Sequence, residues 1–224
     1  MIDVVIVNWN SGKLIYSCVE SIHKFHDDVI KKIIVVDNGS TDGSDVRLED
    51  FSLVTLIRAQ SNLGFAKACN LGAQHSKNKF ILFLNPDTKI YPGTFNKVLK
   101  FMSEPNQKSF GICGVQLIDE DEHVLRHCSR EPTVNNFIFH AIGLDRIIPK
   151  LGYVMDEWDH LSTQKVDHVI GAFYFVRRHV FQRLNGFDER FFVYLEDVDF
   201  SVRAQKIGWG CVYYSDAKVH HLCG

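Results

Sequence analysis

The sequence lacks the cysteine spacing of a disulfide-stabilised or zinc-binding protein. Its six cysteines form neither a C-x-x-C pair nor a regular framework, and four of them lie inside apolar or periodic segments. We therefore expect reduced, mostly buried thiols. The cysteines are Cys18, Cys69, Cys113, Cys128, Cys211 and Cys223.

Long apolar runs and an excess of one charge are also absent. No window approaches the ~18 consecutive apolar residues of a membrane-spanning helix, and the chain begins at once with the strand-like run "IDVVIV". Lys plus Arg number 25 against 27 Asp plus Glu, a formal net charge of -2, so nothing indicates nucleic acid as a partner. We expect a cytoplasmic protein whose membrane contact, if any, is peripheral.

The glycine-rich loops that bind phosphates in two large nucleotide-binding classes are missing as well. After its first apolar run the chain has "VNWNSGK", with a single glycine. This segment matches neither the dinucleotide-binding G-x-G-x-x-G nor the P-loop G-x-x-x-x-G-K-[ST]. Hydride transfer and ATP hydrolysis therefore lose support, and the phosphates of a bound nucleotide must be held by another device.

What the 224 residues do contain is the alternation of an α/β domain. Strand-like runs at 2–7, 32–36, 53–57 and 80–84 alternate with helical spacing between Leu14 and Phe25, at 63–76 and at 92–104. Further strands are predicted at 110–117, 168–176 and 209–214, and a last helix at 196–207. We predict one α/β domain, 1–224, with a mainly parallel central sheet flanked by helices.

The stretch 119–165 is polar and only weakly periodic, so we expect it to be the variable or mobile part of the chain. Its segment 135–153, "NNFIFHAIGLDRIIPKLGY", mixes apolar and basic residues. Ordinary packing in the core is the favoured interpretation of this segment. Contact with a membrane interface is the alternative.

Asp37 stands at the carboxyl end of the second predicted strand, in "VVDNGSTDGS" (35–44). In an open α/β sheet, ligands bind in the crevice outside the carboxyl ends of the strands. A carboxylate at this position can hydrogen-bond a nucleobase or a ribose. An Asx-type turn explains the same residues equally well.

Asp87 follows the apolar strand of "FILFLNPDT" (80–88). A carboxylate at such a strand end can bind a hard divalent cation, which would neutralise a diphosphate. A turn that merely ends the strand is the more common role of Asn-Pro-Asp-Thr. Because the phosphate loops are missing, a metal held by Asp87 is the available candidate for phosphate binding.

Glu196, Asp197 and Asp199 fall in the first turn of the last predicted helix. The helix dipole favours acidic residues there, so one or two of them need no functional explanation. Three acids directly after the aromatic run "RFFVY" are harder to explain in this way. A carboxylate at an aromatic-walled helix start is a candidate general base.

Two histidines, His220 and His221, lie near the end of the chain with Cys223. Structural zinc sites use four ligands in paired spacing, and no partner pair is present. One imidazole that joins an oxygen-rich Mg²⁺ or Mn²⁺ site is the better metal interpretation. A pair of surface histidines is the alternative.

Seven motifs, taken in order, resemble glycosyltransferase family 2 with its GT-A nucleotide-sugar fold, and most closely the bacterial rhamnosyltransferase-like branch. Each motif alone is weak, whereas seven in the same order are specific and cover nearly the whole chain. The motifs are "VIVNWN" (5–10), "VVDNGSTDGS", "NLGFAKACNLGA" (62–73), "FLNPDT", "GAFYFVRR" (171–178), "LNGFDERFF" and "EDVDFSVR".

The resemblance implies a donor site in the first half of the chain. The end of the first strand, Val7, Asn8 and Asn10, would line the base and ribose pocket together with Asp37. Three further residues would pack under the nucleotide. These are Asn62, Gly64 and Asn70.

The resemblance also assigns the metal. Asn85 and Asp87 correspond to the family's Asp-x-Asp metal motif. Asn85 replaces the first Asp, so metal coordination rests on Asp87, while the amide can hydrogen-bond a ribose or a water on the metal. His221 falls where relatives place a histidine that binds the metal or the diphosphate, with His220 one register away.

For catalysis, the resemblance makes Asp197 the base, with Glu196 and Asp199 positioning it or the acceptor. The implied activity is a metal-dependent, inverting transfer that uses Mg²⁺ or Mn²⁺. The implied donor is dTDP-rhamnose, with a UDP-hexose as the alternative. The implied acceptor is a glycan or lipid-linked glycan in cell-surface polysaccharide synthesis, at the inner face of the cell membrane.

Residues 1–110 would form the nucleotide-binding half and 111–224 the acceptor and catalytic half. Family members commonly continue with further helices, so we expect a C-terminal segment beyond Gly224. Two rival functions remain. Asn85 favours a catalytically silent nucleotide-sugar-binding module. A nucleotidyltransferase would use a glycine-rich, basic N-terminal loop, which "VNWNSGK" does not resemble.

Overall fold

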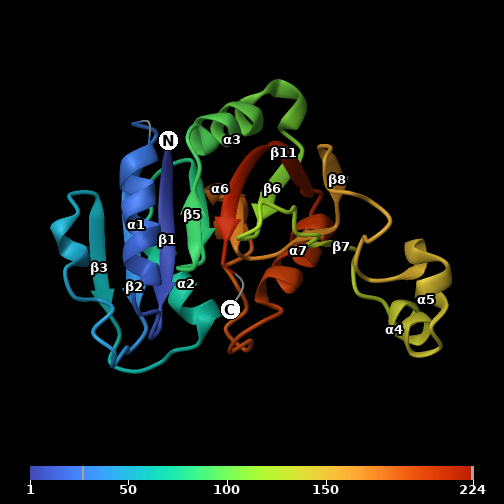
Figure 1. The fold of residues 1–224 in the computed structure, drawn as a ribbon, viewed down its shortest axis with the longest axis horizontal. Helices are drawn as coiled ribbons and strands as arrows, with labels where there is room; N and C mark the ends of the chain where they lie inside the picture. The colour runs from blue at the N-terminus through green and yellow to red at the C-terminus, as the bar shows by residue number, and fades with distance from the viewer. Residues whose placement is uncertain (27, 223–224) are drawn as a thin grey trace.

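The computed structural model describes residues 1–26 and 28–222. In this part of the chain, nine strands form one mixed sheet (Figure 1). They are β1 (Ile2–Asn8), β2 (Ile30–Asp37), β3 (Val54–Arg58), β4 (Phe80–Leu84), β5 (Thr88–Ile90), β6 (Phe110–Ile118), β8 (Gln164–Val166), β10 (Phe173–Arg177) and β11 (Gly210–His221). Their order is β3-β2-β1-β4-β10-β6-β11-β5, and β8 pairs with β11. A second, two-stranded sheet joins β7 (Cys128–Ser129) to β9 (His168–Val169).

The α/β fold with a central sheet flanked by helices is confirmed. Strands β3, β2, β1 and β4 are parallel, as predicted. Strand β10, by contrast, runs antiparallel to both β4 and β6. After β6 the chain runs for a long stretch outside the carboxyl edge of the parallel strands. It returns to the sheet from that same edge, so β10 runs in the opposite direction.

Helices cover both faces of the sheet, and each face has its own apolar core. Helices α1 (Leu14–Phe25) and α3 (Thr94–Ser103) pack on one face. The other face carries α2 (Phe65–Gln74), α6 (Arg178–Arg183) and α7 (Glu196–Lys206). Because β1 lies between two covered faces, all seven of its residues are buried, which explains why five of the seven are apolar.

The helical spacing predicted after the first strand is confirmed in α1, whose buried residues are Ile15, Cys18, Val19 and Ile22. The described cysteines are free and buried, in agreement with the expectation of reduced thiols. The sixth, Cys223, lies outside the described residues. Within the described ranges, no helix has both the length and the apolarity to cross a bilayer.

Two strand predictions need correction. The run 168–176 forms not one strand but two, β9 and β10, in different sheets. The backbone turns between them at Gly171, whose N–H donates to the carboxylate of Asp197. The last strand does not end at 214 but continues as β11 to His221. After a register shift between Tyr214 and Lys218, its end pairs with both β6 and β5.

The middle of the chain also differs from expectation. It contains two helices, α4 (Val134–Ala141) and α5 (Leu144–Ile147), in a lobe beside the sheet (Figure 1). Neither helix has a buried residue, so the interpretation of 135–153 as core packing is wrong. The polar side of α4 makes the bonds within the lobe, which leaves its apolar side outward. Short 3-10 helices complete the fold at η1 (Leu48–Asp50), η2 (Pro105–Gln107) and η3 (Pro149–Leu151).

Candidate active site

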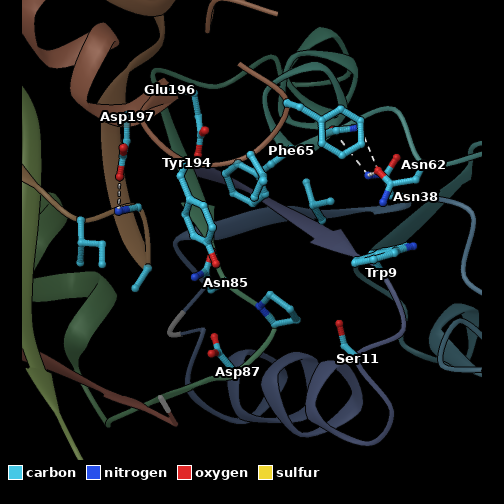
Figure 2. A pocket seen from close by; sticks show the side chains of 18 of the residues that line it. Trp9, Ser11, Asn38, Asn62, Phe65, Asn85, Asp87, Tyr194, Glu196 and Asp197 are labelled. Carbon is cyan, nitrogen blue, oxygen red and sulfur yellow. Dashed lines mark hydrogen bonds between the residues drawn. The ribbon is translucent and has the colours of Figure 1, made fainter. Parts of the chain in front are cut away.

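A cavity of about 450 Å³ lies at the carboxyl ends of β1 and β4 (Figure 2). Residues from both halves of the chain form its walls, because β10 and the start of α7 lie next to these strand ends. The lining residues are Val7, Trp9, Ser11, Leu14, Asn38, Asn62, Gly64, Phe65, Asn85, Pro86, Asp87, Ile170, Gly171, Ala172, Phe192, Val193, Tyr194, Glu196 and Asp197.

Seven of the residues predicted for the site lie in these walls, and six do not. Those in the walls are Val7, Asn62, Gly64, Asn85, Asp87, Glu196 and Asp197. Those outside are Asn8, Asn10, Asp37, Asn70, Asp199 and His221. Of the second group, His221 contacts the wall residue Asp87 directly, and the other five contact segments that shape the cavity.

Asn8 and Asp37 form a buried network beneath the cavity wall. The Asn8 amide donates to Asp37 Oδ1 and to Ser44 Oγ, both at 2.8 Å. Asn10 accepts from the backbone N–H of Thr41. In contrast to the expectation that these residues line the base and ribose pocket, their bonds fix the loop 38–44 on the end of β1.

Asn38 and Asn62 form the polar part of one wall. The Asn38 amide donates to Asn62 Oδ1 at 2.9 Å, and Asn38 Oδ1 accepts from the N–H of Leu63. Trp9, which is 55% exposed, lies on the same side of the pocket in Figure 2. An exposed aromatic ring beside two amides can stack on a planar base while the amides hydrogen-bond its edge.

Asp87 occupies a corner of the cavity with His221 behind it. His221 Nε2 lies 3.4 Å from Asp87 Oδ2, because β11 pairs antiparallel with β5 and sets His221 opposite Thr88. Of the two adjacent histidines, His221 is therefore the one next to Asp87. Oδ1 of Asp87 is buried and has no hydrogen-bond partner in the described structure.

The unpartnered oxygen at Asp87 fits a cation ligand, because a buried carboxylate oxygen without a partner carries a desolvation cost that a cation would remove. Among residues 1–26 and 28–222, no three His, Cys, Asp or Glu side chains are grouped so that they could hold a metal ion. Asp87 and His221 thus supply at most part of a coordination shell.

Glu196 and Asp197 begin α7 on the opposite side of the pocket (Figure 2). The two residues before them, Tyr194 and Leu195, have left-handed φ values of 66° and 71°, an uncommon conformation for such side chains. This turn reverses the chain sharply, so the first two residues of the helix face the cavity.

The carboxylate of Asp197 is held on both oxygens. Oδ2 accepts from Gly171 N–H at 2.8 Å, and Oδ1 accepts from Val198 N–H at 2.8 Å. A Cβ at position 171 would lie 3.2 Å from Oδ2, so a glycine gives this contact its room. His168 Nε2 lies 3.7 Å from Oδ2, and burial lowers the pKa of His168.

The carboxyl of Glu196 has a different environment from that of Asp197. Its side chain is buried, and Oε2 has no hydrogen-bond partner among the described residues. Burial raises the pKa of Glu196 to about 7, and the neighbouring Asp197 charge adds to the shift. Near neutral pH this carboxyl can therefore both donate and accept a proton.

Asp199, by contrast, pairs with Arg203 at 2.7 Å on the same helix. Arg203 in turn donates to the carbonyls of Leu184 and Gly186. The expectation that Asp199 positions the base or the acceptor has no geometric support, because its carboxylate holds the loop before the aromatic segment.

The aromatic segment 192–194 forms the outer wall, with Tyr194 78% exposed. Gly64 allows its approach: a Cβ there would lie 2.7 Å from the Phe192 carbonyl, which accepts from Phe65 N–H. Asn70 anchors the preceding loop through two bonds to the Phe187 backbone. Asn70 therefore supports the aromatic segment from outside the cavity wall.

The motifs did not point to Trp9, Asn38, His168 and Gly171 as individual site residues, although each lies in or beside the cavity. Trp9 and Asn38 are adjacent to predicted residues. Their position at the ends of strands was the signal that could have identified them as site residues. No signal in the sequence links His168 to Asp197, because 29 positions separate them and only the packing of β9 on α7 brings them together.

Sequence comparisons cover most of the chain. The family model for glycosyl transferase family 2 matches residues 3–184. An N-acetylglucosaminyl-diphospho-decaprenol L-rhamnosyltransferase of Mycobacterium tuberculosis is 30% identical over 204 residues, 84% of this chain and 66% of that protein. The rhamnosyltransferase WbbL of Escherichia coli is 27% identical over 218 residues, 93% of this chain and 78% of that protein. The chain thus spans just under two thirds of the first relative's length.

Solved structures match the fold. The mannosyltransferase PcManGT of Pyrobaculum calidifontis, in complex with GDP-Man and Mn²⁺, has a TM-score of 0.70 at 18% identity, over 100% of this chain and 57% of that chain. TarS of S. aureus, residues 1–349 with UDP-GlcNAc, has a TM-score of 0.68 at 17% identity, over 100% and 58%. The fold is that of the GT-A glycosyltransferases. Because the family model covers most of the chain, this protein belongs to glycosyltransferase family 2, where it is similar to rhamnosyltransferases.

Proposed function

We propose that this protein is a metal-dependent, inverting glycosyltransferase that moves a sugar from a nucleotide-diphosphate donor to an acceptor hydroxyl. The observation that supports it most is that one cavity contains both a possible cation ligand and a pair of carboxyls. Asp87, backed by His221, offers an unpartnered oxygen to a cation, and the carboxyls of Glu196 and Asp197 lie across the same cavity. A site that only bound a nucleotide would not need the carboxyls of Glu196 and Asp197.

The donor would lie along the carboxyl ends of β1, β2 and β4. Its base would stack on Trp9, with Asn38 and Asn62 at its edge, and its diphosphate would point to Asp87. Residues 1–110 would supply most of these contacts and 111–224 the catalytic ones. We propose dTDP-rhamnose as the donor, by analogy with the similar rhamnosyltransferases, and a UDP-hexose as the alternative.

Mg²⁺ or Mn²⁺ at Asp87 and His221 would supply positive charge where the diphosphate leaving group becomes more negative. Asp87 is the main ligand in this proposal, because Asn85 offers a neutral amide in place of a second carboxylate. His221 would orient Asp87 and contribute its ring nitrogen. Two solved structures of the same fold, PcManGT and GalNAc-T7, contain Mn²⁺.

Asp197 would take the proton from the acceptor hydroxyl as that oxygen attacks the anomeric carbon. The new bond forms on the face opposite the diphosphate oxygen, whose bond to the sugar breaks and takes the electron pair with it. Configuration inverts, and no covalent sugar intermediate is needed. The backbone N–H groups of Gly171 and Val198 hold the carboxylate in place, and Glu196 would position the acceptor hydroxyl.

The acceptor would be a glycan or lipid-linked glycan in polysaccharide synthesis. The relative from Mycobacterium tuberculosis is named for a lipid-linked acceptor, a decaprenol diphosphate. We therefore propose that transfer takes place at the inner face of the cell membrane. A second candidate, a catalytically silent nucleotide-sugar-binding module, is favoured by Asn85 alone.

Replacing Asp197 with Asn should lower turnover at least ~100-fold and leave donor affinity nearly unchanged, because an amide cannot accept the acceptor proton. Steady-state release of nucleoside diphosphate measures turnover, and calorimetry with the donor measures affinity. Asp121→Asn, at an exposed carboxylate that does not line the cavity, is the control and should behave as wild type. Turnover of Asp197→Asn within a few-fold of wild type would move the role to Glu196, the other carboxyl in the cavity wall.

Chelation with EDTA should abolish transfer, and added Mg²⁺ or Mn²⁺ should restore it. Asp87→Ala should weaken binding of the nucleoside diphosphate much more than binding of the nucleoside, because only the diphosphate needs the cation. His221→Ala should raise the metal concentration needed for half-maximal activity. His220→Ala, at the adjacent position, should leave that concentration unchanged. Full activity in EDTA rules out the metal requirement.

Glu196→Gln should change how stability depends on pH. The unfolded chain ionises Glu196 near its ordinary pKa of 4.5, whereas burial holds the folded value at about 7. Between these values the unfolded state loses the proton first, so wild type loses stability as pH rises. The melting temperature of Glu196→Gln relative to wild type should therefore rise across this window and level off above it. Parallel profiles would show that Glu196 is not held protonated.

The donor can be identified by calorimetry and turnover with dTDP, UDP and their sugars. We expect dTDP-rhamnose to bind and react. One methyl separates the two bases and is worth only ~1–3 kcal/mol in an apolar pocket, whereas an unpaired buried polar group costs more, so the sugar should be selected more sharply than the base. Turnover of UDP-glucose or UDP-galactose, with no binding of dTDP-rhamnose, would exclude the rhamnosyl donor but not the transferase.

A further inference from the structure

Helix α4 carries an apolar stripe that no other part of the described chain covers. Val134, Phe137, Ile138, Ala141 and Ile142 follow the spacing of one helix face, and all five are exposed. Val134 is 74% exposed, Phe137 62% and Ile142 67%. In a globular protein this face normally lies against the core, so its exposure in five neighbouring positions requires an explanation.

The polar side of α4 makes the bonds that hold the lobe together. Thr133 caps the helix by a reciprocal bond pair with Asn136, and the Asn136 amide also donates to the Leu151 carbonyl at 3.0 Å. His140 Nδ1 lies 2.7 Å from Asp145 Oδ2. The helix is thus oriented by its polar face, and this arrangement directs the apolar stripe outward.

The exposed apolar surface continues onto the next helix. Ile147 is 79% exposed and Ile148 46%, and α5 contacts α4 directly. Figure 1 shows both helices at one end of the molecule, beyond the β7 and β8 edge of the structure. An apolar lobe that projects in this way can insert into a fluid interface, which does not need a complementary binding pocket.

The charges of the lobe indicate which interface this is. Asp145 is the single acidic residue of 134–152, its side chain is 16% exposed, and it pairs with His140. Arg146 and Lys150 are exposed. The apolar surface therefore has cations beside it, which complement anionic headgroups. Two copies of this lobe face to face would instead bring cations together.

We propose that the α4–α5 lobe, residues 134–152, docks on an anionic lipid bilayer. The stripe of α4 lies among the acyl chains near the headgroups, and Arg146 and Lys150 contact lipid phosphates. The inference deepens the proposed function, because docking of the lobe would bring the cavity to an acceptor that is anchored in a membrane. It rests on the proposed function for that acceptor. Its test needs no catalysis.

The test is cosedimentation of the full chain with vesicles of phosphatidylcholine and phosphatidylglycerol in equal parts. Wild type should sediment with them. The double variant Phe137→Asp and Ile142→Asp should lose at least ~10-fold in partition coefficient, because charge replaces two side chains that would be buried in the interface. Val46→Asp changes an equally exposed apolar residue, 62% exposed and outside the lobe, and should bind as wild type.

A second pair of variants isolates the electrostatic part. Arg146→Gln with Lys150→Gln should weaken binding to the anionic vesicles about 10-fold or more and leave the weaker binding to pure phosphatidylcholine unchanged. Circular dichroism checks that each variant is folded. Equal sedimentation of wild type and the Asp double variant overturns the proposal, as does a wild type that binds no vesicles.

Sedimentation velocity without lipid tests whether a second copy of the chain covers the stripe instead. A wild-type dimer that the Asp double variant converts to monomer would assign the stripe to a second copy and overturn the membrane proposal. Turnover with a water-soluble acceptor keeps the two proposals separate. Vesicle binding without any transfer rejects the proposed function alone, whereas transfer without vesicle binding rejects the membrane surface alone.

Discussion

The candidate site depends on the parallel pairing of β1 with β2 and β4. This pairing sets the carboxyl ends of three buried strands at one edge of the sheet, where their backbones diverge and polar residues can follow them. Asn8 and Asp37 are opposite each other in the register and share a buried hydrogen bond. Their bond fixes the loop after β2, and the cavity forms between that loop and the turn after β4.

The second half of the chain completes the cavity through two departures from regular structure. After a register shift within β11, its end pairs with β6 on one side and with β5 on the other, and the pairing with β5 delivers His221 to Asp87. The left-handed pair Tyr194 and Leu195 turns the start of α7 toward the cavity. Strain of this kind persists where surrounding contacts hold it, and here the Phe192 carbonyl is bonded to Phe65 N–H.

Two adjacent carboxyls at the start of α7 show how environment separates their chemistry. Asp197 accepts two backbone hydrogen bonds and lies near His168, whereas Glu196 is buried with one oxygen unpartnered. Hydrogen bonds from N–H groups stabilise a charged carboxylate, and burial without them stabilises the neutral acid. This difference is the reason why the proposed reaction gives these two sequence neighbours different parts, base and positioning group.

The sequence by itself determined the α/β class, the first four strands, the helices between them and the ordered motifs of the family, because buried strands and amphipathic helices have local periodic signatures. It also named Asp87, Glu196 and Asp197. Only the tertiary structure decided which residues line the cavity and which, like Asn70, support it from behind. It also set His221 beside Asp87 and turned the apolar side of α4 outward. These outcomes depend on register and on packing between distant segments, and periodicity in the sequence carries no record of either.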